Sequence, residues 1–167
     1  MVLIKTYYMN RLIGFLLFIT VLSFNFSLVS CKKKCKVDEL NKDSGEIIDS
    51  VVFYPTSGYM TSSMGGNYVV TSSHPYADRF EIKIGQGVKQ PVDYTQYTIL
   101  ANPISATCDV AFEREVKIDD ANQKVIYSVK ATQCPDCETT NYIENYVLVP
   151  AFPSNYEVVF DTVVITK

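Results

Sequence analysis

The chain has 167 residues and a net charge of −3, with five cysteines, twelve tyrosines and no tryptophan. A chain of this length fits one folded domain with its own core. Its mildly acidic balance excludes a general electrostatic attraction to nucleic acid, so nucleic acid is not among the expected partners.

The first thirty residues have the pattern of an export signal. Lys5 and Arg11 are their basic residues, no acidic residue precedes Asp38, and residues 12–29 are mostly apolar. A positive start followed by an apolar stretch is typical of a secretory signal. A transmembrane helix is the alternative, but a span needs about 20 apolar residues, so the stretch is borderline in length. We therefore expect a signal helix over residues 1–30.

The end of this stretch carries a specific motif, because Leu28-Val29-Ser30-Cys31 resembles the lipobox of bacterial lipoproteins. The lipobox consists of an aliphatic residue, a tolerant position, a small residue and a cysteine. The resemblance implies cleavage between Ser30 and Cys31, with a diacylglycerol and an N-acyl lipid such as palmitate on Cys31. Stable anchoring takes more than one acyl chain, and a diacylated cysteine meets that condition without a spanning helix. No cofactor is expected besides this covalent lipid.

Residues 31–45 are expected to form a lipidated flexible tether, because residues 32–45 are charged and poor in large apolar groups. Residues 1–30 contain two basic and no acidic residues, so their removal takes the net charge from −3 to −5. By resemblance to the sorting rule of Gram-negative lipoproteins, Lys32 in place of an aspartate favours the outer membrane, at its periplasmic face. The inner membrane and the cell surface are the alternatives. The membrane is thus the first expected partner.

Residues 46–167 have the pattern of a single all-β domain, an antiparallel β-sandwich or a barrel. Short runs rich in Val, Ile, Tyr, Phe and Thr alternate with clusters of Gly, Pro, Asn and Asp, and no helical stripe is evident. We expect strands at 46–54, 67–72, 79–84, 95–100, 110–118, 124–132, 142–149 and 156–166.

The strongest signal is a β-hairpin formed by 110–118 and 124–132. Apolar residues alternate with polar ones along both segments, which predicts one buried and one solvated face. Arg114 interrupts the buried side, and residues 119–123 supply the turn. If the turn is centred on Ala121, Cys108 lies directly across from Cys134, within reach of a bridge after local twisting.

Lipidation of Cys31 leaves four other cysteines, and the compartment outside the cytoplasm permits disulfides. We expect a structural bridge from Cys108 to Cys134, or to Cys137 after a register slip, with Cys35 free or loosely paired. The alternative is a redox-active Cys134-Pro-Asp-Cys137 pair, but the helix that stabilises the thiolate in thioredoxin-like enzymes is not predicted here. Zinc binding is disfavoured because the chain has no second C-x-x-C.

Other candidate sites are few. His74 is the only histidine, so a Ser-His-Asp mechanism would pass through it, but Ser72-Ser73-His74-Pro75 lacks a nucleophile elbow. We therefore predict an exposed loop histidine, with no catalytic and no metal-binding residue. Tyrosines in or beside predicted loops can serve as binding surfaces, although tyrosine is also common on exposed sheet faces, which is the simpler alternative. The tyrosines selected as binding candidates are Tyr59, Tyr68, Tyr76 and Tyr142.

A second resemblance covers the C-terminal half of the chain. The segment from Tyr97-Thr98-Ile99-Leu100 through the cysteines to the strand at 158–165 looks like small uncharacterised lipoproteins of Bacteroidota. That resemblance implies an envelope location and no specific activity. The leading hypothesis is a non-enzymatic binding or assembly domain that engages an envelope protein or a glycan. The alternatives are a thiol-disulfide oxidoreductase using Cys134 and Cys137, and a protease-inhibitor-like β domain.

Overall fold

The computed structural model describes residue 37 and residues 40–55, 66–107, 110–135 and 140–167. The described residues all belong to one unit, 35–167. The expected signal helix and the lipidation site lie outside them, as do Tyr59, Cys108 and Cys137. Within these ranges, no helix is long and apolar enough to cross a membrane.

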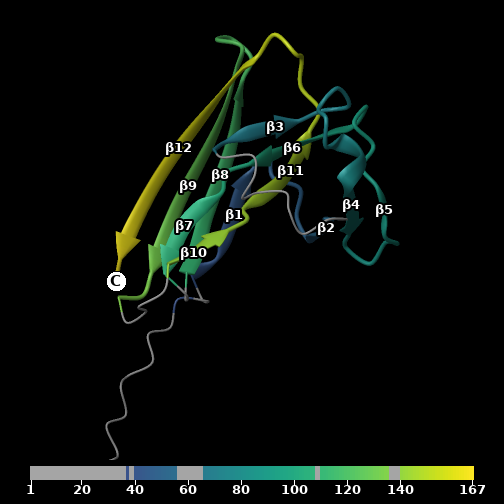
Figure 1. The fold of residues 1–167 in the computed structure, drawn as a ribbon. Helices are drawn as coiled ribbons and strands as arrows, with labels where there is room; N and C mark the ends of the chain where they lie inside the picture. The colour runs from purple at the N-terminus through teal and green to yellow at the C-terminus, as the bar shows by residue number, and fades with distance from the viewer. Residues whose placement is uncertain (1–36, 38–39, 56–65, 108–109, 136–139) are drawn as a thin grey trace, which may run out of the picture. The chain divides into compact units, whose positions relative to one another are not determined.

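The described chain is almost entirely β-structure, and the prediction of an all-β sandwich is confirmed (Figure 1). A short 3-10 helix, η2 (Ala77–Arg79), separates two of the strands. The strands are β1 (Lys42–Gly45), β2 (Val51–Pro55), β3 (Tyr68–Val70), β4 (Phe80–Ile84), β5 (Gln90–Pro91), β6 (Tyr97–Ala101), β7 (Ile104–Thr107), β8 (Val110–Asp119), β9 (Lys124–Gln133), β10 (Thr140–Ile143), β11 (Tyr146–Pro150) and β12 (Glu157–Thr166).

The predicted hairpin forms the centre of a four-stranded sheet with the order β1-β8-β9-β12. Its turn is one residue shorter than predicted, because Asp119 still pairs with Lys124 and Val110 pairs with Gln133. The Asp119 carboxylate accepts a hydrogen bond from the Asn122 backbone N–H at 3.1 Å, and Gln123 has a φ of 52°. The assumption of a turn centred on Ala121 is therefore wrong by one residue in register.

Two outer pairs of this sheet are parallel rather than antiparallel. β1 pairs with β8, and β12 pairs with β9 over its whole length. The ordered domain also begins before the predicted boundary at Glu46, because β1 occupies the end of the segment expected to be a tether. Val37, which is 1% exposed, packs with Ala111 and Cys134. Charged residues in this segment suggested a solvated linker, but two of them, Lys42 and Asp43, lie on an edge strand.

The remaining strands form three sheets, with the orders β10-β7, β11-β6-β3 and β2-β4-β5. The sheet containing β6 and β11 is buried on both faces. Leu100 and Val147 pack into the cluster beneath the four-stranded sheet, whereas Ile99 and Leu148 pack into a second cluster with Phe80 of β4. Burial on both faces explains why β6 and β11 are continuous apolar runs rather than alternating ones. The core is thus divided into two layers by a central sheet.

Candidate functional site

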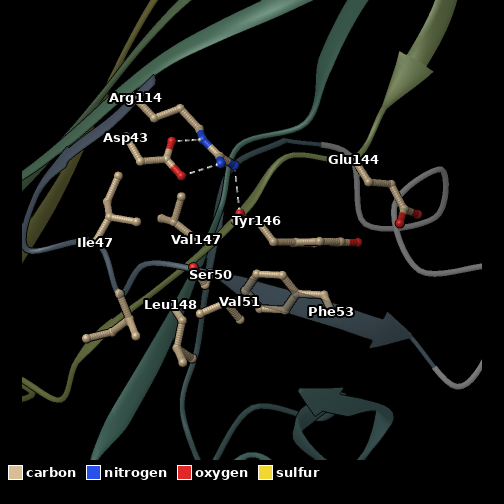
Figure 2. A pocket seen from close by; sticks show the side chains of 11 residues that line it. Asp43, Ile47, Ser50, Val51, Phe53, Arg114, Glu144, Tyr146, Val147 and Leu148 are labelled. Carbon is tan, nitrogen blue, oxygen red and sulfur yellow. Dashed lines mark hydrogen bonds and ion pairs between the residues drawn. The ribbon is translucent and has the colours of Figure 1, made fainter. Parts of the chain in front are cut away.

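Arg114, the residue that interrupts the buried side of β8, forms an ion pair with β1. The parallel register places Asp43 directly opposite Arg114. The guanidinium binds the carboxylate in a fork, with 2.6 Å from Nε to Oδ1 and 2.7 Å from Nη2 to Oδ2 (Figure 2). Bidentate pairs of this kind combine strong hydrogen bonds with fixed geometry. The pair therefore holds β1 in register against β8.

The same guanidinium also reaches β11 and the turn before it. Its Nη1 donates to the Asn145 side-chain oxygen at 3.1 Å and to the Tyr146 carbonyl at 3.0 Å. Three of its nitrogens are thus engaged, and the side chains of Arg114 and Asp43 are only 24% and 28% exposed. Because its donors are used by the protein, Arg114 is a structural cross-link between two sheets rather than a group available for a substrate.

A cavity of about 390 Å³ opens beside this cross-link. Figure 2 shows Arg114 and Asp43 along one side, the rings of Tyr146 and Phe53 across the middle, and Glu144 at the opposite end. The two rings are in contact, with centroids 5.6 Å apart. The cavity is lined by Asp43, Ile47, Ile48, Ser50, Val51, Phe53, Arg114, Glu144, Tyr146, Val147 and Leu148.

Three tyrosine hydroxyls are buried in the core, and two of them, those of Tyr127 and Tyr146, belong to residues near Arg114. The hydroxyls of Tyr68, Tyr127 and Tyr146 make no hydrogen bond of standard geometry within the described part of the chain. Burial raises the pKa of all three above its ordinary value, although Arg114 acts in the opposite direction on the pKa of Tyr127. These phenols therefore stay protonated at neutral pH. They add polarity to the wall of the core without supplying a nucleophile or a base.

Two of the candidate tyrosines lie together around His74. The imidazole stacks on Tyr68 with centroids 5.7 Å apart, and it contacts the Tyr76 ring at the same distance. Its Nδ1 accepts a hydrogen bond from the Tyr76 backbone N–H at 3.3 Å. Partial burial lowers the pKa of His74, so the ring is neutral near pH 7. His74 is half-buried in an aromatic cluster rather than exposed, and its recorded contacts are aromatic and backbone ones.

Contrary to the prediction from the sequence, the tyrosine candidates do not all lie in loops. Tyr68 belongs to strand β3 and is half-buried. Tyr142 belongs to strand β10 and is 43% exposed. Tyr59 lies outside the described residues. The structure therefore brings Tyr68 and Tyr76 together, and leaves Tyr142 as an exposed ring on a short strand.

Cys134 lies at the end of β9 and is 2% exposed. It is disulfide-bonded, but its partner lies outside the described residues, and no complete bridge is contained within them. Cys108 lies outside the described residues, and the described pairing of the hairpin ends at Val110 with Gln133. The bridge between these two cysteines stays a prediction. Burial of the Cys134 sulfur disfavours thiol-disulfide exchange, because attack on a disulfide requires access to it.

The sequence reasoning missed the cavity and the ion pair that supports it. Arg114 interrupts the alternation of apolar and polar residues along β8, and this interruption was the sequence signal that could have indicated the ion pair. Its partner Asp43 was assigned to the tether, so the pair was not predicted. Across the described ranges, no three His, Cys, Asp or Glu side chains are arranged to hold a metal ion.

Comparisons with known proteins add no relative. No protein-family model matches the chain, and neither the curated proteins nor the solved structures contain a significant match. The two resemblances described above therefore stay predictions, and the function must be argued from the residues themselves.

Proposed function

We propose that this chain is a lipid-anchored protein of the bacterial cell envelope whose β domain binds another envelope protein without catalysing a reaction. The observation that carries the binding role is the cavity of about 390 Å³ beside the Arg114–Asp43 pair. One wall is fixed by a cross-link between sheets, and the lining combines charged and apolar side chains around a preformed cavity, as binding sites often do. Within the described chain, the cavity contains no activated nucleophile and no metal cluster.

The chemistry of the cavity favours a protein ligand over a glycan. Sugars stack on open aromatic faces, but Tyr146 is only 8% exposed. The cavity lining includes the half-buried apolar side chains of Val51 and Phe53 together with the Glu144 carboxylate. A Lys or Arg side chain has a matching aliphatic stem and cationic head. We therefore expect a basic side chain of a partner protein to enter the cavity.

The lipobox resemblance supports the envelope location. A diacylglycerol and an N-acyl lipid on Cys31 would anchor the mature chain, and Lys32 favours the periplasmic face of the outer membrane. In this position the β domain would meet other envelope proteins. Burial of Cys134 disfavours the oxidoreductase alternative. No feature of the described strands favours the protease-inhibitor alternative.

The anchor is tested by Cys31→Ala. This variant should appear in the soluble fraction or as an uncleaved precursor, because the thiol that takes the lipid is gone. The measurement is membrane fractionation combined with intact-mass determination of the chain. A variant that still sediments with membranes as a processed species of lipidated mass would contradict the anchor.

The binding role is tested by reversing one charge at the cavity. Glu144 is exposed and lines the cavity, so Glu144→Lys should repel a basic ligand without unfolding the domain. Asp78→Lys is the matched control, because Asp78 is also exposed but lies in η2 and does not line the cavity. After crosslinking in the envelope, the full-length wild-type chain and the Asp78→Lys chain should recover the same partner proteins. The Glu144→Lys chain should not recover them. Equal recovery by both variants would exclude the cavity as the binding site.

A further inference from the structure

Strand β12 is a long edge strand of the four-stranded sheet, with no described strand beyond it. It is the last strand in the order β1-β8-β9-β12, and none of the other described strands pairs with its outer side (Figure 1). It has ten residues, whereas every other described strand at the end of a sheet has two to five. Proteins usually keep such edges short, charged or interrupted by proline, because an open edge is a template for another strand.

The residues of β12 that present backbone groups outward can be assigned from its pairing with β9. Glu157 N–H donates to the Gln123 carbonyl, and Lys167 N–H donates to the Gln133 carbonyl. In a parallel ladder, alternate residues direct both backbone groups to the same neighbour. The odd-numbered residues therefore bond to β9. The residues that direct their N–H and C=O outward are Val158, Phe160, Thr162, Val164 and Thr166.

The side chains of this strand do little to discourage pairing. Asp161 is the single charged residue between Val158 and Thr166, and the strand contains no proline. Val163, Val164 and Ile165 are 50%, 44% and 39% exposed. An exposed apolar strand with a bare edge buries surface and satisfies its backbone groups when a second strand is added.

We propose that two copies of this chain associate through antiparallel pairing of their β12 strands about a two-fold axis at Thr162. In this register Val158 faces Thr166 of the second copy, and Phe160 faces its Val164. All of these are residues that direct their backbone groups outward, so each facing pair exchanges two hydrogen bonds. The pairing joins the two four-stranded sheets into one continuous sheet. This proposal does not depend on the cavity or on its ligand.

Charge complementarity selects a second copy and this register. With Thr162 on the axis, Glu157 of each copy, which also forms an exposed ion pair with Lys124 of its own chain at 3.2 Å, faces Lys167 of the other copy, and Val159 faces Ile165. A shift by one residue would bring outward groups opposite inward ones, and a shift by two would place either Glu157 opposite Ile165 or Lys167 opposite Val159. An isologous contact of this kind closes at two copies, because each edge is used once.

The register is tested by cysteine crosslinking in the full-length, membrane-anchored chain. Asp161 and Val163 face each other in the proposed pair at a non-hydrogen-bonded position, where Cβ atoms lie about 4.5–5.5 Å apart. Membranes that contain both Asp161→Cys and Val163→Cys chains should give an oxidised dimer at least ten-fold above wild type. Either variant alone should stay at the wild-type level. A mixture that gives no more dimer than the single variants would overturn the proposed register.

The dimer itself is tested by removing one outward donor. Val164→Pro removes an N–H that β9 does not use, so dimerisation of the detergent-solubilised chain should weaken about ten-fold. Glu157→Lys should also weaken it, and Lys167→Glu in the same chain should restore it. The measurement is sedimentation equilibrium, with Val88→Pro as the control, because Val88 is 76% exposed and lies away from β12. A wild-type chain that is monomeric, or a Val164→Pro chain that dimerises as well as the control, would overturn the proposal.

Discussion

The two edges of the four-stranded sheet are built in opposite ways. At one edge, β1 is four residues long and is fixed by the forked pair between Asp43 and Arg114. At the other edge, β12 is ten residues long and carries a single charge between Val158 and Thr166. The first edge is joined to a second sheet through Arg114 and borders a cavity. The second has no described strand beyond it.

This difference separates two kinds of interaction on one sheet. A rigid edge beside a cavity suits recognition of a single side chain, because its geometry is set before the ligand arrives. A bare edge suits the addition of a whole strand, which needs free backbone groups rather than a shaped cavity. Substitutions at β1 should therefore change folding stability, and substitutions on the outward side of β12 should change association.

The largest expected effect is at Gly45, the last residue of β1. Its φ is +72°, and a Cβ added there would overlap the Val116 carbonyl oxygen. Gly45→Ala should lower the free energy of unfolding by about 2–4 kcal/mol, through backbone strain and displacement of β1. Gly85→Ala is the matched control, because Gly85 has a φ of +54° and nothing within 4 Å of an added Cβ. Urea denaturation compares them, and equal losses would mean that the close approach to β8 costs nothing.

A smaller loss is expected from Arg114→Ala. The substitution leaves the Asp43 carboxylate and the Tyr146 carbonyl without their donor in a half-buried site. Stability should fall by about 2–3 kcal/mol, less than for a fully buried pair because both side chains are about one-quarter exposed. Lys117→Ala breaks the exposed pair with Glu115 and should cost about 0.5 kcal/mol or less. If the two variants have the same denaturation midpoint, the cross-link does not hold β1 in place.

The smallest effect is expected at Tyr127 and depends on pH. Burial raises its pKa above the ordinary value of 10.0, so the folded chain holds this proton more tightly than the unfolded chain. The resulting stability is complete below about pH 10 and falls as the pH rises above it. Tyr127→Phe should change stability at neutral pH by about 1 kcal/mol or less, because the hydroxyl makes no standard hydrogen bond.

The alkaline measurement separates Tyr127 from the other buried phenols. Denaturation midpoints are recorded over a series of pH values from neutral to above pH 10, with tyrosinate absorbance as a second signal. Tyr127→Phe should show a shallower loss of stability than the wild type. Tyr94→Phe is a useful comparison, because burial raises the pKa of Tyr94 to about 12. A wild-type slope in the Tyr127→Phe chain would show that its proton contributes nothing to folding.

Local patterns in the sequence were enough to predict the strands of the hairpin. The alternation along β8 and β9 depends on neighbours two residues apart, so it is visible in the chain itself. Strands β4, β6 and β12 were also expected close to where they lie. The short strands β1, β5 and β7 were missed, because two to four residues carry too little pattern to stand out from a loop.

The candidate site could not be predicted, because its parts come from distant segments. Arg114 and Asp43 are 71 positions apart, and no local pattern connects them. Parallel pairing of β1 with β8 is decided by packing of the whole domain, as is the two-faced burial of β6 and β11. The predicted register of the hairpin was wrong by one residue, because Asp119 pairs with Lys124 and the turn has four residues, with a positive φ at Gln123.

The two parallel pairs have a consequence for the rate of folding. Each joins segments far apart in the chain, 71 positions for β1 with β8 and 33 for β12 with β9. Rates fall as the mean separation of contacting residues rises, because loop entropy is lost before the contacts form. The hairpin can form early from local contacts. We expect β1 and β12 to pair with it later, one at each of its two edges. Until the flanking strands pair, both edges of the hairpin expose backbone groups, and such exposed edges are where folding intermediates aggregate.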